Sequence, residues 1–278
     1  MSVGIVTDST AYLPESIIAE LGIEVVQLQV ISNGVAYNEV DGITMEQVAL
    51  ALRANMQVTT SRPNPEVFVA AYERLISNGA DSIVSAHLSS ELSGTFESAL
   101  MASRKVSCPV EVVDSRGIAM MLGFAVQAGA KLAKSGATAT EAGELIKRKS
   151  LGSSILFYVD SLEFLERGGR INSMQARMGT AMHLKPLLHM SNGKVEQREL
   201  VRTREKALSR MVDIVCGGDQ IKSEIAVHHV DAELAAKELA HELQYRTGLT
   251  DIPVSTAGAV VGTHVGPGAL AIVISPQI

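Results

Sequence analysis

The chain has 278 residues, a formal net charge of −6 and a composition that is 46% hydrophobic but only 4% aromatic. This length suits one large domain or two ordinary ones, and the absence of tryptophan implies a mainly aliphatic core. The acidic balance repels phosphate backbones, so we expect no nucleic-acid partner. The two cysteines, Cys108 and Cys216, lack metal-ligand spacing, which argues against a zinc site and fits a reducing cytoplasm.

The sequence carries no signal of export or of membrane insertion. Its first residues read as the start of a strand rather than as a basic segment followed by an apolar one. No run of eighteen uncharged apolar residues occurs. We therefore expect a cytoplasmic protein without stable membrane insertion.

In the first half of the chain, short runs typical of strands alternate with helical patterns. The expected strands are residues 4–7, 23–31, 81–86 and 110–113. The expected helices are residues 14–21, 44–56, 65–77, 94–103, 118–134 and 140–149. Thr44 and Gln47 have the spacing of a capping box at the start of the second helix. This alternation predicts a mostly parallel sheet with helices on both faces.

From about residue 153 the pattern indicates antiparallel pairing. Two apolar runs, 184–190 and 195–201, flank Asn192-Gly193, which is a strong hairpin signal. The other expected elements are a strand at 155–159, a helix through Glu163 and Leu165, a helix at 204–215, a strand at 225–229, a helix at 232–245, and strands around Val260 and Ile272. We predict an α/β domain over residues 1–150 and an α+β domain with a mixed or antiparallel sheet over residues 151–278.

Five polar stretches are candidate parts of a ligand site. They are Asp8-Ser9-Thr10, "TTSRPNP" (59–65), "HLSSELSGTF" (87–96), "ERGGRIN" (166–172) and the glycine-rich "GTHVGPGAL" (262–270), which we interpret as a turn. Asp8 and Asp114 each end a predicted strand with the pair Asp-Ser. Ligands bind at the carboxyl ends of parallel strands, although both aspartates have the alternative role of capping the next helix.

Each of these stretches also has a purely structural interpretation. Thr60, Ser61 and Ser93 would be helix caps, and Gly168 and Gly169 would end a helix. Taken together, however, hydroxyls, a glycine at a helix start, an arginine and a histidine supply what one carboxylate or phosphate needs. No dinucleotide, P-loop, zinc-protease or nucleophile-elbow motif is present. We therefore predict no catalytic residue, no metal and no cofactor.

Seven segments occur in the order that is typical of one known family. They are "VTDSTAYLP", "TTSRPNP", "SSELSGTFESA", "SLEFLERGGRI", "LKPLL…NGKV", "VRTREKAL" and "THVGPGAL". From Ile5 to about Ile272 the chain therefore resembles DegV-family proteins, and in particular the fatty-acid-binding subunits of bacterial fatty acid kinase. The resemblance implies a two-domain carrier, itself not an enzyme, that buries one long-chain fatty acid in a tunnel between its domains. It also implies a partner, a kinase subunit related to dihydroxyacetone kinases, that forms the acyl phosphate used in phospholipid synthesis.

The resemblance also implies roles for individual residues. The hydroxyls of Thr60 and Ser93 would hold the acyl carboxylate, and Arg170 and Arg202 would face the phosphate or the partner. Further residues near the carboxylate would be Ser61, Gly94, Thr95 and His264. Two positions depart from the family pattern, since Tyr12 replaces a usual aspartate and Arg62 replaces a usual glutamine. Arg62 adds a cation beside the predicted carboxylate loop.

The physical chemistry of the ligand fits such a site. A buried carboxylate needs hydrogen-bond donors, and burial of a tail of about sixteen carbons gains on the order of 10 kcal/mol before the costs of binding. We expect the tail to contact the apolar stretch 117–126, through Met120, Met121 and Phe124, although the alternative for each of these residues is a plain core position.

Two other functions stay open at this point. One is a hydrolase or transferase that uses Ser93 and His264, which requires a third group to orient the base. The other is a sensor of a small anionic metabolite. The sequence leaves open the chain length and unsaturation of the acid, the oligomeric state, the identity of the kinase and the pathway served.

Overall fold

The structure, a computed structural model, describes residues 2–171, 184–217 and 223–277. Contacts within the chain divide it into two compact units. Unit 1 comprises Met1–Gln29 and Ser61–Gly152, and unit 2 comprises Val30–Thr60 and Ser153–Ile278. The boundaries of these units differ from the predicted division of the chain at residue 150. Residues 30–60 belong with the C-terminal part of the chain rather than with the N-terminal part.

Unit 1 is built on a parallel sheet with the strand order β2-β1-β6-β7. Its strands are β1 (Val3–Asp8), β2 (Ile23–Val26), β6 (Ser82–His87) and β7 (Val110–Asp114). β1 and β6 are buried almost throughout, as expected for strands covered on both faces. The parallel sheet predicted from the sequence is confirmed, and the carboxyl ends of β1, β6 and β7 meet at one edge.

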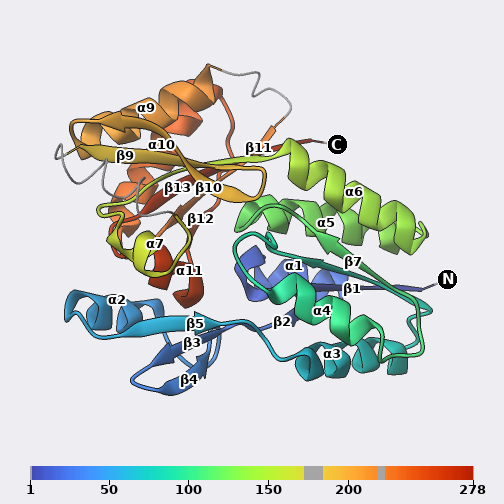
Figure 1. The fold of residues 1–278 in the computed structure, drawn as a ribbon. Coiled ribbons are helices and arrows are strands. Elements are labelled where there is room, and N and C mark those ends of the chain that lie inside the picture. Colours follow the sequence, from blue (N-terminus) through green and yellow to red (C-terminus); the bar gives the residue numbers. More distant parts are fainter. Residues whose placement is uncertain (1, 172–183, 218–222, 278) are drawn as a thin grey trace. The chain divides into compact units, whose positions relative to one another are not determined.

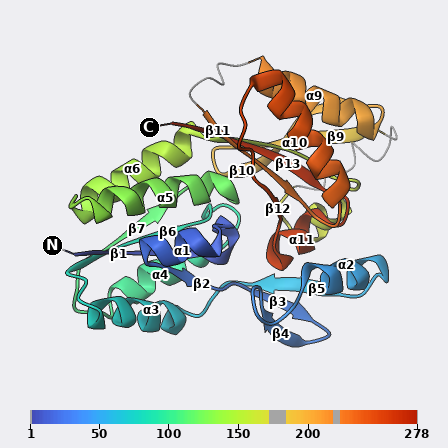
Figure 2. The same ribbon diagram turned by 180° about the vertical axis from the view of Figure 1, so that it is seen from behind.

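Helices cover both faces of this sheet (Figure 1). α3 (Pro65–Ser77) and α4 (Thr95–Ser103) lie on one face, where Phe68, Tyr72, Ile83 and other residues form a buried cluster. α5 (Met120–Lys134) and α6 (Ala139–Gly152) lie on the other face, and they pack against each other. The short helix α1 (Glu15–Leu21) contacts α5 (Figure 2), and the 3₁₀ turn η1 (Ser9–Ala11) follows β1.

Unit 2 contains a six-stranded sheet with the order β10-β9-β8-β13-β11-β12. Its strands are β8 (Ser154–Tyr158), β9 (Lys185–Ser191), β10 (Lys194–Val201), β11 (Ser223–His229), β12 (Val254–Thr256) and β13 (Leu270–Pro276). All pairs are antiparallel except β11 with β12. Asn192 and Gly193 have φ of 48° and 82°, which is the left-handed backbone that a tight hairpin requires. The predicted hairpin and the mixed sheet are confirmed.

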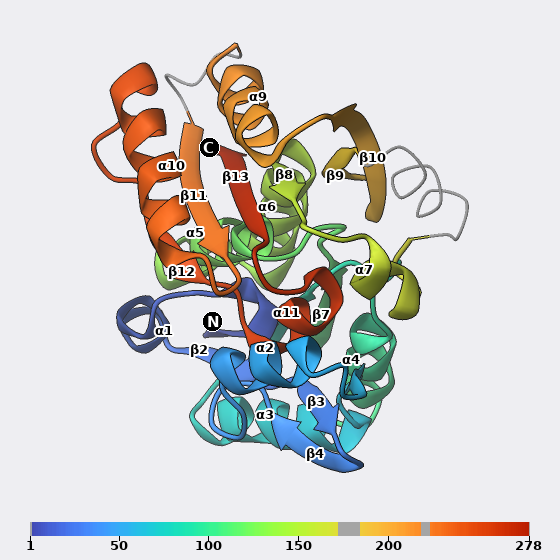
Figure 3. The ribbon, with the colours of Figure 1, turned by 90° about the vertical axis from the view of Figure 1, so that its left-hand side faces the viewer.

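Two helices, α9 (Arg204–Cys216) and α10 (Glu233–Thr247), cover one face of the six-stranded sheet (Figure 3). Leu156, Leu187, Met211 and Leu243 lie in the core between them and the strands.

Two shorter helices are α7 (Glu163–Arg167) and α11 (Ala259–Val265). The strand predicted around Val260 is therefore wrong. The buried residues of α11 recur at the three- and four-residue spacing of a helix, which a short apolar run does not distinguish from a strand.

Residues 30–60 form a small sheet and a helix of their own. The sheet has the order β4-β3-β5, with β3 (Gln29–Ser32), β4 (Val35–Asn38) and β5 (Val58–Ser61). The helix α2 (Met45–Arg53) packs beside α11 (Figure 3). The single strand predicted over residues 23–31 is wrong, because the chain breaks at Leu28, whose N–H donates to Ser9 Oγ at 3.0 Å. The predicted capping box of Thr44 and Gln47 is confirmed.

Candidate functional site

The loop between β6 and α4, residues 88–94, brings the predicted hydroxyls to a helix start. Gly94 is the N-cap of α4, and no side chain of the described residues caps this helix. Ser93 Oγ lies 2.8 Å from Thr95 Oγ1 instead, so the interpretation of Ser93 as the helix cap is wrong. Two hydroxyls therefore lie beside the first backbone N–H groups of a nine-residue helix, where the helix dipole favours an anion.

Arg62 lies against the same loop. A Cβ atom at Gly94 would be 2.8 Å from Arg62 Cδ and 2.9 Å from Arg62 Nη1, so glycine leaves room for this side chain. The φ of Gly94 is an ordinary −73°, which means that space rather than backbone conformation calls for glycine here. Neither Thr60 nor Ser61 caps the following helix α3, because the side chain of Asn64 accepts a hydrogen bond from Glu66 N at 3.1 Å.

Thr60 and His264, 204 positions apart in the sequence, meet in unit 2. Thr60 ends the run of unit 2 residues in β5, and its Oγ1 lies 2.8 Å from His264 Nε2. His264 was predicted in a glycine-rich turn, but it lies in the last turn of α11, and the turn follows at Gly266. Gly168 lies against the imidazole, since a Cβ atom there would be 2.2 Å from His264 Nδ1. This nitrogen is buried and has no hydrogen-bond partner among the described residues.

The imidazole of His264 is uncharged near neutral pH. Burial, together with the positive charge of Arg170, lowers the pKa of His264 to about 4. Burial also lowers the pKa of Arg170, whose Nη1 donates to the carbonyl oxygen of Gly168. We assign the ring proton to Nε2, because an N–H at Nδ1 would be buried without an acceptor. Nε2–H then donates to Thr60 Oγ1, which leaves the Thr60 hydroxyl hydrogen available to an anion.

The remaining predicted residues are placed as follows. Arg202 is exposed in the turn between β10 and α9 of unit 2. Met120, Met121 and Phe124 lie on α5 of unit 1 and are 6%, 4% and 7% exposed. Their burial is compatible with a core role and with an apolar ligand contact, so the assignment to the tail stays a prediction. Gly168 and Gly169 end α7, as the structural interpretation of that pair predicted.

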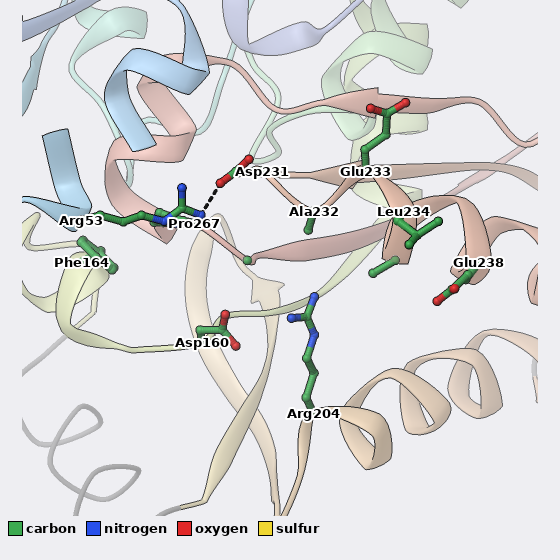
Figure 4. Close-up of a pocket in the computed structure, with 12 residues that line it drawn as sticks. Arg53, Asp160, Phe164, Arg204, Asp231, Ala232, Glu233, Leu234, Glu238 and Pro267 are labelled. Carbon is green, nitrogen blue, oxygen red and sulfur yellow. Dashed lines mark hydrogen bonds and ion pairs between the residues drawn. The ribbon is translucent and has the colours of Figure 1, made fainter. Parts of the chain in front are cut away.

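An open pocket of about 700 Å³ in unit 2 lies elsewhere, at the start of α10 (Figure 4). No residue of the predicted carboxylate site lines it. Arg53 forms an ion pair with Asp231 at its rim, and Arg204 lies over the ring of Tyr158 at 5.8 Å. The hydroxyl of Tyr158 donates to Asp160 Oδ1 at 2.5 Å. Several of the charged groups that line this pocket therefore already have partners within the protein.

Sequence reasoning missed a buried polar network in unit 1. Tyr72 Oη donates to Ser85 Oγ at 2.8 Å, Ser85 Oγ lies 2.7 Å from His87 Nε2, and His87 Nδ1 lies 3.1 Å from Asp8 Oδ2. The sequence signal was the alternation Ser85-x-His87, which places both side chains on one face of β6. The order Ser-His-Asp resembles a hydrolytic triad, but all these residues are 0% exposed, which keeps a substrate out.

No helix of the ranges 2–171, 184–217 and 223–277 is long and apolar enough to cross a membrane. Within the same ranges, no three His, Cys, Asp or Glu side chains group so that they would hold a metal ion.

Comparison with known proteins gives one consistent result. The sequence model of the family described as "Uncharacterised protein, DegV family" matches residues 2–277. A DegV domain-containing protein of Streptomyces coelicolor is 47% identical over 279 residues, which covers 99% of both chains. The structure titled "Fatty Acid Binding of a DegV family Protein from Thermus thermophilus" superposes with a TM-score of 0.91 at 30% identity, covering 99% of this chain and 100% of that one.

A second solved structure is that of DegV from Bacillus subtilis, which is titled a fatty acid binding protein. It superposes with a TM-score of 0.88 at 33% identity and covers 99% of both chains. These neighbours share the two-unit α/β architecture over essentially the whole length of the chain.

Proposed function

The chain belongs to the DegV family, and from this premise we propose that it buries one long-chain fatty acid and presents the carboxylate to a separate ATP-dependent kinase. Two structural neighbours above 25% identity carry fatty acid binding in their titles, which supports the first part of the proposal. The acyl phosphate formed by the kinase would enter phospholipid synthesis.

The pair formed by Thr60 and His264 is the observation that carries the proposal. A neutral imidazole that donates Nε2–H to Thr60 Oγ1 fixes the hydroxyl so that its own hydrogen is free to donate to a carboxylate oxygen. A charged imidazole would lie beside Arg170 without a counter-ion, and the low pKa of His264 avoids that arrangement. The site thus provides a neutral hydrogen-bond donor for an anionic head group.

The start of α4, where Ser93 lies, supplies backbone amides as donors in addition to a hydroxyl. The hydroxyl of Ser93 and the amides of Gly94 and Thr95 lie at the uncapped start of α4, and the side chain of Arg62 lies against Gly94. We propose that Ser93 and Thr60 bind the same carboxylate. Hydrogen bonds to a charged group contribute about 1.5–3 kcal/mol each, so two hydroxyls account for much of the head-group affinity.

Arg170 and Arg202 are proposed to act at the step that involves the kinase. Arg202 is exposed and forms no ion pair with the described residues, so its guanidinium is accessible to a phosphate or a partner. Arg170 lies beside His264, close to the hydroxyl that would hold the carboxylate.

A hydrolase built on Ser93 and His264 is disfavoured. Such an enzyme needs a third group that orients the imidazole through its other nitrogen. Nδ1 of His264 has no partner among the residues that the structure describes, and Nε2 is engaged by Thr60. The geometry around His264 therefore fits a binding site better than a general base.

Native mass spectrometry of the purified protein tests the binding proposal. Wild type is expected to retain one fatty acid per chain, whose mass also gives the chain length and unsaturation. The double variant Thr60→Ala/Ser93→Ala should lose it and remain folded. Thr59→Ala/Ser107→Ala, which removes two exposed hydroxyls, is the matched control and should retain it. Unchanged occupancy in the first double variant would overturn the carboxylate assignment, and a small polar anion in wild type would favour the metabolite sensor.

The kinase part needs its own measurement. Loaded protein, ATP and a dihydroxyacetone-kinase-like subunit should together yield an acyl phosphate that hydroxylamine traps as a hydroxamate. Omission of either protein should abolish the product. Product formation by the fatty-acid-loaded chain and ATP alone would contradict the role as a non-enzymatic carrier.

A further inference from the structure

The loop that carries Ser93 is held by aspartates from the strands on both sides of β6. On the β1 side, Asp8 Oδ2 accepts hydrogen bonds from Leu88 N at 3.0 Å and from the ring of His87 at 3.1 Å. Asp8 Oδ1 accepts from Thr10 N at 3.1 Å and from Thr10 Oγ1 at 2.6 Å. This fully buried carboxylate fixes the first residue of the loop 88–94.

On the β7 side, Asp114 holds the third residue of the loop. Its Oδ2 accepts from Ser90 Oγ at 2.6 Å, and its Oδ1 accepts from Ser90 N at 3.2 Å. Oδ1 also accepts from Arg116 N at 2.9 Å, and Arg116 Nε lies 3.1 Å from Oδ2. The two strand-ending Asp-Ser pairs of the sequence thus do more than cap the segment that follows each of them.

The hold on Ser90 extends to Ser93 through the backbone. Ser89 N donates to Gly117 O at 2.8 Å, which pins the residue between Leu88 and Ser90. Ser89 O in turn accepts from Leu92 N at 3.0 Å and from Ser93 N at 3.2 Å. One hydrogen bond therefore joins the amide of Ser93 to Ser89, whose two sequence neighbours, Leu88 and Ser90, are held by Asp8 and Asp114.

We propose that Asp114 is a positioning residue for the carboxylate-binding hydroxyl of Ser93, an inference that rests on the function proposed above. Asp114 ends β7, the edge strand of the sheet, and its side chain is 16% exposed. Its charge is compensated by Arg116. Its bonds go to the loop 88–94 and to the turn after β7, and the loop is the element that presents Ser93.

The test compares the rate at which bound fatty acid leaves the protein. Asp114→Ala and Ser90→Ala each remove the short hydroxyl–carboxylate bond, and each should speed dissociation about ten-fold, which corresponds to the loss of one ordinary hydrogen bond. Glu91→Gln is the matched control, because it removes a carboxylate of the same loop that pairs with Arg116, and it should leave the rate unchanged. An unchanged rate in Asp114→Ala would overturn the proposal.

Two further readouts separate positioning from a merely structural role. In a Ser93→Ala background, Asp114→Ala should cause no additional acceleration, whereas a general loss of stability would accelerate release by the same factor in both backgrounds and would overturn the proposal. In ligand-free protein, Asp114→Ala should raise amide hydrogen exchange of residues 90–95 at least ten-fold. This exchange is measurable even if wild type retains no fatty acid, so the failure of the proposed function is distinguishable from the failure of the positioning role.

Discussion

Two hydroxyl–histidine pairs, one in each unit, have nearly the same length and opposite chemistry. Ser85 Oγ lies 2.7 Å from His87 Nε2 in unit 1, and Thr60 Oγ1 lies 2.8 Å from His264 Nε2 in unit 2. The difference lies at the other ring nitrogen. Nδ1 of His87 contacts the carboxylate of Asp8, whereas Nδ1 of His264 has no partner among the described residues.

The second nitrogen decides which way the hydroxyl hydrogen points. The carboxylate of Asp8 keeps the proton of His87 on Nδ1, so Nε2 is an acceptor, and Ser85 must donate to it. Tyr72 then donates to Ser85, so the polar side chains of this network satisfy one another. At His264 the proton is on Nε2, so Thr60 accepts and its own hydrogen is unused. The first pair is a closed structural network, whereas the second leaves a hydroxyl hydrogen for the carboxylate proposed above.

The largest expected effect is on the closed network. Asp8→Asn replaces an acceptor of four hydrogen bonds by an amide whose NH₂ group faces the N–H donor of Leu88 in one orientation and that of Thr10 in the other. Disruption of such a buried group should lower the free energy of unfolding by about 3–5 kcal/mol. Urea denaturation measures the free energy of unfolding of Asp8→Asn and of a control variant, Asp81→Asn. The control alters an exposed carboxylate that accepts from Ser2 N. Equal stability of the two variants would contradict the network as described.

A second prediction concerns the pH dependence of stability. The pKa of His264 is about 4 in the folded protein and about 6.5 for an unperturbed histidine, so the unfolded chain binds more protons between these values. Stability should therefore fall as the pH is lowered from 6.5 toward 4, by about 1–2 kcal/mol for this residue once its partial exposure is considered. His228, which is buried and also has a pKa lowered to about 4, adds to the same trend.

His264→Gln separates the contribution of the open pair, Thr60 and His264, to this pH dependence from the contributions of the other titratable groups. The slope of unfolding free energy against pH between 6.5 and 4 should become shallower in this variant. His241→Gln, which alters an exposed histidine on α10, is the control and should keep the wild-type slope. An unchanged slope in His264→Gln would mean that the imidazole of the open pair is not held neutral by its surroundings.

Local sequence signals predicted the elements whose boundaries are set by local chemistry. The helix at 65–77 was predicted to the residue, because Pro65 favours the first helical position and the apolar spacing runs without interruption to Ser77. The hairpin followed from Asn192-Gly193, which accepts the left-handed backbone of the turn. The parallel sheet of unit 1 followed from short apolar runs between helical patterns.

Elements fixed by distant contacts were missed or misplaced. The run 23–31 is uniformly rich in strand formers, and the break at Leu28 depends on Ser9, nineteen residues earlier. Val260 lies in a short apolar run, and its N–H donates to a side chain 221 positions earlier in the sequence, Glu39. The same limit applies to the site. Residue composition indicated the hydroxyl loop, but a bond between residues 60 and 264 has no signature in either local stretch.

The smallest expected effect concerns the orientation of His264. Its Nδ1, unlike that of His87, contacts no carboxylate among the described residues. His264 is fixed by its helix, α11, whose second residue Val260 donates its N–H to Glu39 Oε1 at 3.0 Å. Glu39 is 7% exposed, and nearby Met45 packs where a Cβ atom at Gly262 would lie, so residues 30–60 hold α11 at two points.

Glu39→Ala should therefore cost about 1 kcal/mol of unfolding free energy, as the loss of a helix cap does, and should weaken fatty-acid retention less than loss of the Thr60 hydroxyl. Glu39→Gln keeps an acceptor oxygen and should recover most of both quantities. Urea denaturation and native mass spectrometry of the two variants measure them. If Glu39→Ala matched wild type in retention and stability, the position of α11 and the orientation of His264 would not depend on this cap.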